Sequence, residues 1–400
     1  MRAISFSCQG ESHIASGKVC QDYSYSHVYE NGNAIAIVCD GHGGKRYFRS
    51  DVGAKIAAKV AEVKVNGFID QIGESLIKGT PFTQRGTISE QIAKGDFSKS
   101  NKIDSAFRWL FGSIISEWNS LVTAHAECNP ITETEKTSLE ERWVTDFEGK
   151  VNFEKVYGCT LMVYVYTPEY WFAFQIGDGK CFACNDKGNW TEPIPWDDNC
   201  FLNKTTSISD SGAIDEFRYC YEGDGVHPIA VILGSDGIDD SFGLPENQAN
   251  FYVQILKSIV TSGEEATIKE IESDLPQLSK IGSQDDMSLS MIYDEEKLKE
   301  IYLKLIEWQI SNVKRDIANE YCKIGKANKI QQSLESIERP TRQNLIDLQY
   351  ANADEKKAIE IGGKLMVRLE VLMKELNKFD RGFPLFGFII LKFMVIFLLY

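Results

Sequence analysis

Cysteine and positive charge are both scarce in this sequence of 400 residues. Ten cysteines are too few for a disulfide scaffold in a chain of this length, and several lie in apolar runs, as buried thiols of a reducing cytosol do. The 43 lysines and arginines are outnumbered by 58 aspartates and glutamates, which gives a net charge of −15. Because duplex binding needs a basic face, this balance argues against a nucleic-acid partner. It leaves room for a metal site, which would recruit carboxylates.

Signal-peptide, repeat and zinc-site patterns are also missing. The N-terminal residues 1–8 have no sustained apolar core, and no internal repeat is evident. Cys181 and Cys184 form a CxxC without a second pair at zinc spacing, and on a strand their side chains would point to opposite faces. A hydrophobic content of 43% and a charged content of 25% are ordinary for a globular chain. The length fits one large domain or a catalytic domain with an appendage.

The most informative stretch runs from Ala34 to Gly44. Its first six residues are apolar and predict a buried strand, which ends abruptly at Asp40-Gly-His-Gly-Gly. One carboxylate and one imidazole, from Asp40 and His42, would then lie at the lip of a sheet, and the glycines would let backbone carbonyls approach a ligand. Hard cations prefer such oxygen ligands. The alternative is a strand-to-helix turn in which Asp40 caps the helix and His42 is merely exposed.

Four more aspartates occupy similar positions. Asp22 precedes a predicted strand that would pair with the Asp40 strand through a turn at residues 30–33. Asp178 interrupts the predicted strand segment 171–184, which we expect to be the second half of a hairpin. Asp236 ends an apolar run, and Asp285 precedes the last predicted strand. Any one of them would be explained as an exposed strand-end carboxylate. Five together would repel one another in a shared cleft, so the set implies bound cations.

Six motifs resemble the metal-dependent PP2C (PPM) family of Ser/Thr protein phosphatases, in its bacterial form. They occur in family order and extend over residues 1–294, with an expanded helical region at 67–155. The resemblance implies an α+β fold, a β-sandwich of two antiparallel sheets flanked by helices. The motifs are Gln-Asp22, Asp40-Gly-His-Gly-Gly44, Gly-Cys-Thr160, Ile-Gly-Asp178-Gly, Gly-Ser-Asp236-Gly-Ile-Asp-Asp240 and Ser-Gln-Asp285-Asp-Met-Ser288.

The resemblance also implies a site at one end of the sandwich. It would hold two Mn²⁺ or Mg²⁺ ions and a third, looser divalent ion, and a water bridging the first two would attack the phosphate. His42 would be the general acid for the departing serine or threonine oxygen. The implied metal ligands are Asp40 bridging two ions, the Gly41 carbonyl on one, Asp236 and Asp285 on the other, Asp22 through a bound water, and Asp178 with Asp236 on the third.

Three positions depart from the family pattern. Gln21 replaces a common glutamate, which changes the charge near the second metal, and Asp286 replaces an asparagine, a change we expect to be tolerated. Gly17 stands where eukaryotic members carry the arginine that binds substrate phosphate. Lys18 or His13 are the candidates to replace it, although each has the alternative of being an ordinary loop residue.

The last hundred residues have a different pattern. Residues 295–380 show apolar residues at three- and four-residue spacing and predict a helical hairpin or coiled coil, which would pack on its own catalytic domain or mediate an oligomer. Residues 383–400 are apolar except for Lys392 and are long enough for a candidate transmembrane anchor. Lys378 and Arg381 would then keep the catalytic domain cytoplasmic, tail-anchored in an inner membrane. The alternative is a terminal helix buried in the protein or in a dimer.

These observations predict a protein phosphatase that acts on phosphoserine and phosphothreonine. Its partners would be a phosphoprotein substrate and a cognate Ser/Thr kinase pathway. The competing hypothesis is a catalytically inactive relative that acts as a binding module through its helical C-terminal region. Inactive copies lose metal carboxylates, and Asp40, Asp236 and Asp285 are all present, which favours the enzyme.

Overall fold

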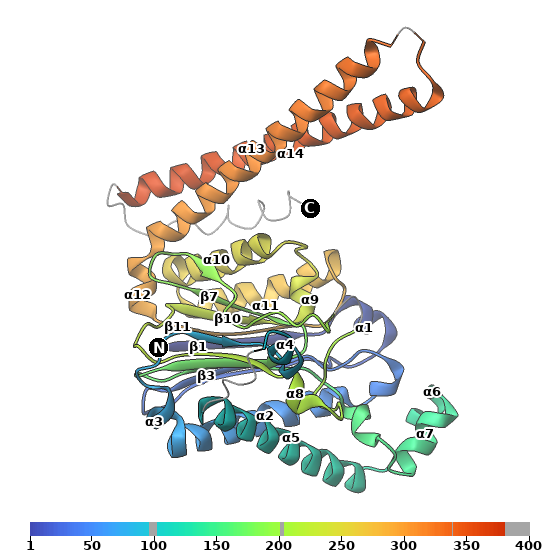
Figure 1. Cartoon of the computed structure of the whole chain (residues 1–400), viewed down its shortest axis with the longest axis vertical. Coiled ribbons are helices and arrows are strands. Elements are labelled where there is room, and N and C mark those ends of the chain that lie inside the picture. The colour runs from blue at the N-terminus through green and yellow to red at the C-terminus, as the bar shows by residue number, and fades with distance from the viewer. Residues whose placement is uncertain (96–101, 201–203, 338, 381–400) are drawn as a thin grey trace. The chain divides into compact units, whose positions relative to one another are not determined.

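A computed structural model of the chain describes residues 1–95, 102–200, 204–337 and 339–380 (Figure 1). The chain divides into two compact units. The first comprises Met1–Asp186, Trp190–Ile255 and Glu265–Leu298, and the second comprises Lys187–Asn189, Leu256–Glu264 and the chain from Lys299 onward.

Two antiparallel sheets form the centre of the first unit, which confirms the predicted α+β sandwich (Figure 1). The five-stranded sheet has the order β1 (Arg2–Cys8), β11 (Met287–Tyr293), β10 (Ala230–Gly234), β7 (Lys180–Cys184) and β8 (Trp190–Thr191). The six-stranded sheet has the order β2 (Tyr23–Val28), β3 (Ala34–Cys39), β5 (Leu161–Tyr166), β6 (Trp171–Ile176), β9 (Arg218–Glu222) and β4 (Thr83–Arg85).

The apolar run of β3 is explained by burial on both faces of its sheet. Ile35 and Ile37 join the core beneath the helices. Ala36 and Val38 alternate with them and join the core between the two sheets. Since neither face meets water, the strand shows a continuous apolar run instead of an apolar–polar alternation.

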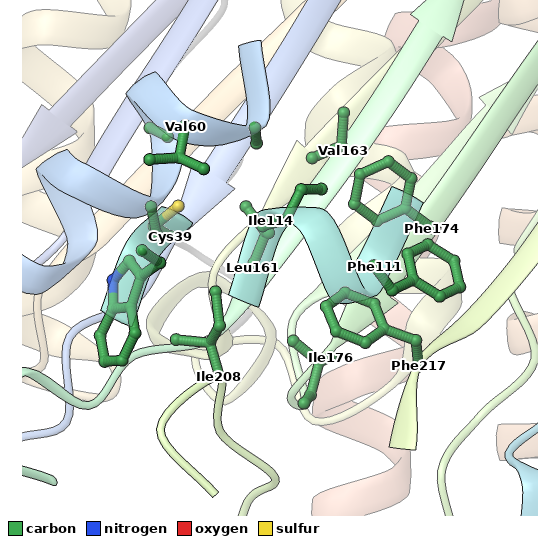
Figure 2. Packing of buried hydrophobic residues seen from close by; sticks show 14 of the residues in the cluster. Cys39, Val60, Phe111, Ile114, Leu161, Val163, Phe174, Ile176, Ile208 and Phe217 are labelled. Carbon is green, nitrogen blue, oxygen red and sulfur yellow. The ribbon is translucent and has the colours of Figure 1, made fainter. Parts of the chain in front are cut away.

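Two long helices cover the outer face of the six-stranded sheet (Figure 1). They are α2 (Ser50–Phe68) and α5 (Lys102–Cys128). In the core between α5 and the sheet, the rings of Phe111 and Phe217 stack with centroids 4.4 Å apart. Figure 2 labels both side chains among the buried residues of this cluster. Trp118 Nε1 donates a hydrogen bond of 3.0 Å to the Gly53 carbonyl, which fixes α5 against α2.

Shorter helices complete the first unit, and α11 and the first part of α10 cover the five-stranded sheet, while α10 continues into the second unit from Leu256 (Figure 1). The α-helices are α1 (Glu11–Ser16), α3 (Glu74–Ile77), α4 (Ile88–Ala93), α6 (Glu133–Ser138), α7 (Glu141–Glu148), α8 (Ala213–Glu216), α9 (Asp236–Asp239), α10 (Pro245–Ser262), α11 (Glu264–Ile281) and α12 (Glu295–Glu300). Single turns of other helix types are η1 (Lys45–Tyr47), η2 (Ile69–Gly73) and η4 (Phe153–Tyr157).

The segment 171–184 is not the single interrupted strand that the sequence predicts. Its first half, β6, pairs with β5 and β9 in the six-stranded sheet. Its second half, β7, pairs with β10 and β8 in the five-stranded sheet. The glycines around Asp178 therefore allow the chain to cross between sheets, and Asp178 lies at that crossing.

The second unit is the predicted C-terminal helical region. Helices α13 (Tyr302–Glu335) and α14 (Arg342–Asp380) share a buried apolar stripe. The predicted tail 383–400 lies outside the described residues. In the part of the chain that the structure describes, no helix combines the length and the apolar character needed to cross a membrane.

Candidate metal and active site

The hairpin of β2 and β3 brings Asp22 opposite Asp40. Tyr23 pairs with Cys39, so the residues just beyond these two are neighbours at the same end of the sheet. The turn closes with a 2.8 Å hydrogen bond from Tyr29 N to the Asn33 carbonyl. The predicted pairing of these two strands is confirmed.

The loop after β3 is held by backbone bonds to the start of β5. Asp40 N donates to Thr160 Oγ1 at 3.0 Å, and Thr160 N donates to the Asp40 carbonyl at 2.8 Å. A Cβ on Gly41 would lie 2.4 Å from the Gln21 carbonyl oxygen, so only glycine permits this close approach. Contacts with Thr160 and Gln21 therefore hold the backbone of Asp40 and Gly41 in place without a bound ligand.

Three aspartates from distant segments meet beside this loop. Asp178 comes from the crossing between β6 and β7, and Asp236 begins α9 directly after β10. Carboxylate oxygens of Asp40, Asp178 and Asp236 lie within 4.8 Å of one another. The sequence predicts five converging aspartates, and the structure brings these three within ligand distance of one another.

The electrostatics of the group fit bound cations. Burial, and then the charge of neighbouring carboxylates, raises the pKa values of Asp22, Asp40 and Asp236 well above their usual range. One oxygen of Asp22 (Oδ2) and one of Asp178 (Oδ1) are buried without a hydrogen-bond partner. Buried, unpaired acceptors that repel one another need positive charge, and oxygen-only donors suit Mg²⁺ or Mn²⁺.

Asp285 belongs to a second group, with His13 and Asp286, whose ligand atoms also lie within 4.8 Å of one another. Asp285 is exposed at the start of β11, and its charge contributes to the raised pKa values of Asp40 and Asp236. It is therefore near the three-aspartate group without being part of it.

Asp286 is a buried anchor for two loops. Its carboxylate accepts 2.6 Å hydrogen bonds from Gly10 N and Gln21 N. Burial alone would raise the pKa of Asp286, but the interaction with His13 and these two backbone bonds outweigh burial and lower it. The sequence indicated only a tolerated replacement at this position.

The two candidates for phosphate binding lie in different environments. His13 is buried, and its Nδ1 lies 2.9 Å from Asp286 Oδ2, an ion-pair distance, although the ring is not aligned for a good hydrogen bond. Lys18 is exposed, and its Nζ donates to the Gly43 carbonyl at 2.7 Å. Lys18 is thus tethered to the glycine loop that carries Asp40 and His42.

His42 follows two residues after Asp40, and its ring packs edge-on against Tyr47 with centroids 4.8 Å apart. Its surroundings include the ion pair of Lys155 and Asp210. Burial lowers the pKa of His42 to about 4, while the charge of Asp210 opposes this shift and that of Lys155 adds to it. The free imidazole is therefore neutral at pH 7.

Other residues support the site without belonging to any of the six motifs. Buried side chains of Gln175, Asp197, Thr206 and Arg218 surround the peptide before Asp178. Their only signal in the sequence is a charged Arg218 inside an aromatic strand, which predicts a buried, paired guanidinium.

Comparisons with known proteins give one family match and several similar solved structures. The model of the family "Protein phosphatase 2C" matches residues 9–275. A bacterial serine phosphatase is 15% identical, with 73% of this chain and 96% of that chain covered and a TM-score of 0.42. The serine/threonine phosphatase Stp1 from Staphylococcus aureus is 14% identical, with coverages of 74% and 95% and a TM-score of 0.42.

A sex-determining protein from C. elegans is 13% identical, with coverages of 76% and 67% and a TM-score of 0.46. No curated protein matches the chain. The family match extends over more than half of the sequence and includes four of the five predicted metal-binding aspartates, Asp22, Asp40, Asp178 and Asp236, together with His42. The chain therefore belongs to the protein phosphatase 2C family of protein serine/threonine phosphatases.

Proposed function

We propose that this protein hydrolyses phosphoserine and phosphothreonine on proteins with divalent cations held by its aspartate cluster. The observation that supports this most strongly is the convergence of Asp40, Asp178 and Asp236, half-buried and mutually repelling, at the end of the sandwich. Asp22 and Asp285 would complete the ligand set, together with the Gly41 carbonyl. Two Mn²⁺ or Mg²⁺ ions, with a third more weakly bound, would lower the pKa of water and offset the charge of the phosphate.

The protein's own residues would orient the substrate and supply a proton. His42 is the proposed proton donor to the departing serine or threonine oxygen. A bound phosphate dianion would stabilise the charged imidazole and raise its pKa from about 4, which favours proton donation only when substrate is present. Lys18 is the better candidate than His13 for contacting phosphate, because it is exposed beside the glycine loop while His13 is buried against Asp286.

The alternative of an inactive binding module has no support in this arrangement. An inactive member would be expected to have lost at least one of the clustered carboxylates, and the buried repulsion between them would then be relieved. The chain instead keeps Asp40, Asp178 and Asp236 together, and the resulting repulsion supports a role for them in binding cations.

Turnover of a phosphothreonine peptide, with and without Mn²⁺, tests the proposal. We expect Mn²⁺-dependent phosphate release by the wild type and a loss of at least about 100-fold in Asp236→Asn, because the substitution removes a ligand charge. Asp354→Asn, an exposed position in α14, is the matched control and should retain full activity. Equal rates in the wild type and Asp236→Asn would refute the proposal.

A further inference from the structure

Gly177, the residue before Asp178, is held on both sides by buried side chains. Gly177 N donates to Thr206 Oγ1 at 3.0 Å. The Gly177 carbonyl accepts from Arg218 Nη2 and, at 3.1 Å, from Gln175 Nε2. Side chains therefore bind the N–H of the peptide before Gly177 and the carbonyl of the peptide after it, which fixes the orientation of both peptides.

The contacts on the two sides of Gly177 meet at Asp197. Thr206 Oγ1 donates to Asp197 Oδ2 at 3.2 Å, and Arg218 Nε lies 3.9 Å from the same oxygen. Arg218 also donates from Nη1 to the Pro195 carbonyl at 3.1 Å. Gly177, Thr206, Asp197 and Arg218 thus form a closed ring of polar contacts, which we call the Gly177 clamp.

The side chains of the clamp are buried, so removing their charged and polar groups from water costs free energy. The exposed fraction of Arg218 is 1%, and Asp197 is fully enclosed. Replacing such an ion pair by apolar residues is often neutral or stabilising, so a buried pair is weak evidence for a role in stability alone. A polar network with defined directions is better suited to fixing one geometry.

The geometry that the clamp fixes is the turn carrying Asp178. Gly177 has a φ of +111°, and a Cβ there would lie 2.4 Å from Thr160 Cγ2. Thr160 in turn accepts the hydrogen bond from Asp40 N. The same small region therefore determines where Asp178 lies relative to Asp40.

We propose that Thr206, Asp197 and Arg218 are positioning residues that set the affinity of the divalent cation bound at Asp178. The inference rests on the proposed function, in which Asp178 is a metal ligand. Thr206 and Asp197 belong to the connection between β8 and α8, so a change in this connection alters cation binding without touching a carboxylate of the cluster. Residues that orient metal ligands commonly change affinity by 10- to 100-fold when removed.

Direct Mn²⁺ binding to the full chain, measured by calorimetry and by electron paramagnetic resonance, tests the inference without relying on turnover. Thr206→Val removes the hydroxyl at nearly constant shape, and Thr206→Ser keeps it. We expect Thr206→Val to weaken one class of Mn²⁺ site about tenfold, with the other sites unchanged, and Thr206→Ser to bind as the wild type. Gln175→Leu removes a donor to the carbonyl of Gly177, on the other side of the same residue, and should weaken the same class of site, which provides a second test if Thr206→Val does not fold.

Comparing Asp178→Asn with the double variant distinguishes a failure of the proposed ligand role of Asp178 from a failure of the proposed role of the clamp. Thr206→Val should have no further effect when Asp178→Asn is already present, because the hydroxyl acts through Asp178. Unchanged Mn²⁺ binding in Asp178→Asn would refute the ligand role of Asp178 and this inference with it. Weakened binding in Asp178→Asn but wild-type binding in both Thr206→Val and Gln175→Leu would overturn the clamp alone. Equal weakening in Thr206→Val and Thr206→Ser would also overturn it, because the hydroxyl would not be the cause.

Discussion

At the scale of single residues, glycines decide how closely the segments of the site approach one another. A Cβ on Gly237, directly after Asp236, would lie 2.0 Å from the Asp286 carbonyl oxygen. That oxygen belongs to the backbone, which cannot rotate away as a flexible side chain would. Glycine at this position therefore allows the Asp236 turn to pack on the loop that precedes β11.

Substituting Gly237→Ala should lower the free energy of unfolding by about 1–3 kcal/mol, because the added methyl forces the two backbone segments apart. Chemical denaturation measures the change. Gly212→Ala is the matched control, since a Cβ there meets no atom within 4 Å and the φ of −104° is accessible to alanine. Equal destabilisation by the two substitutions would contradict this account.

The clustered aspartates, unlike these glycines, should lower the stability of the metal-free protein, because their carboxylates repel one another. Because burial, and then repulsion by neighbouring carboxylates, raises the pKa of Asp40, Asp40→Asn should stabilise the metal-free protein by at least about 1 kcal/mol. Added Mn²⁺ should raise the melting temperature of the wild type more than that of the variant. Thermal melts with a chelator and with Mn²⁺ measure both effects, and a less stable metal-free variant would count against repulsion in the cluster.

At the scale of elements, α10 is joined to the C-terminal helices by a buried polar network within the second unit. Lys257 Nζ lies 2.8 Å from Glu375 Oε2 and 3.0 Å from Gln309 Oε1, and Tyr302 donates to Glu375 at 2.6 Å. The surrounding stripe is apolar, so these contacts distinguish one alignment of the helices from others that would bury the same apolar residues.

Replacing Lys257 alone should therefore be costly. Lys257→Met leaves the Glu375 carboxylate without its cation, and we expect a loss of about 2–4 kcal/mol in the unfolding of the second unit. Adding Glu375→Leu should recover most of this loss, because the paired apolar replacement leaves no unpaired charge. Denaturation of the single and double variants provides the measurement, and additive losses would be inconsistent with a paired network.

At the scale of the whole molecule, the sequence predicts elements whose residues are neighbours in the chain better than contacts between distant segments. The β2–β3 hairpin and the strand ends bearing Asp40 and Asp236 follow from local apolar runs and glycines. The crossing of the chain between sheets at Asp178 does not, because β6 and β7 have the same apolar pattern while belonging to different sheets.

Sequence patterns likewise do not predict the contacts of the Gly177 clamp. Its members Thr206, Asp197 and Arg218 are separated by 29, 20 and 41 positions from Gly177, and none belongs to a recognisable motif. Only folding brings these three residues together around Gly177. Membrane anchoring by residues 383–400 stays a prediction. The existence of a partner Ser/Thr kinase pathway also stays a prediction.

Oligomerisation through the helical region also stays a prediction. Ile359, Met366 and Met373 recur every seven residues on α14, and their exposed fractions are 55%, 44% and 45%. Lysine at Met366 should abolish self-association if this stripe mediates it, because a charge would have to be buried in the contact. Light scattering on the wild type and Met366→Lys measures the mass of each, and equal masses would exclude the stripe.

The claim on which the account depends is that the clustered aspartates hold divalent cations. A crystal structure of the protein grown with Mn²⁺, recorded at a wavelength where manganese scatters anomalously, locates these ions directly. The account predicts anomalous peaks coordinated by Asp40, Asp178 and Asp236, whose oxygens already lie within 4.8 Å of one another. A crystal saturated with Mn²⁺ that shows no peak at these three side chains would contradict it.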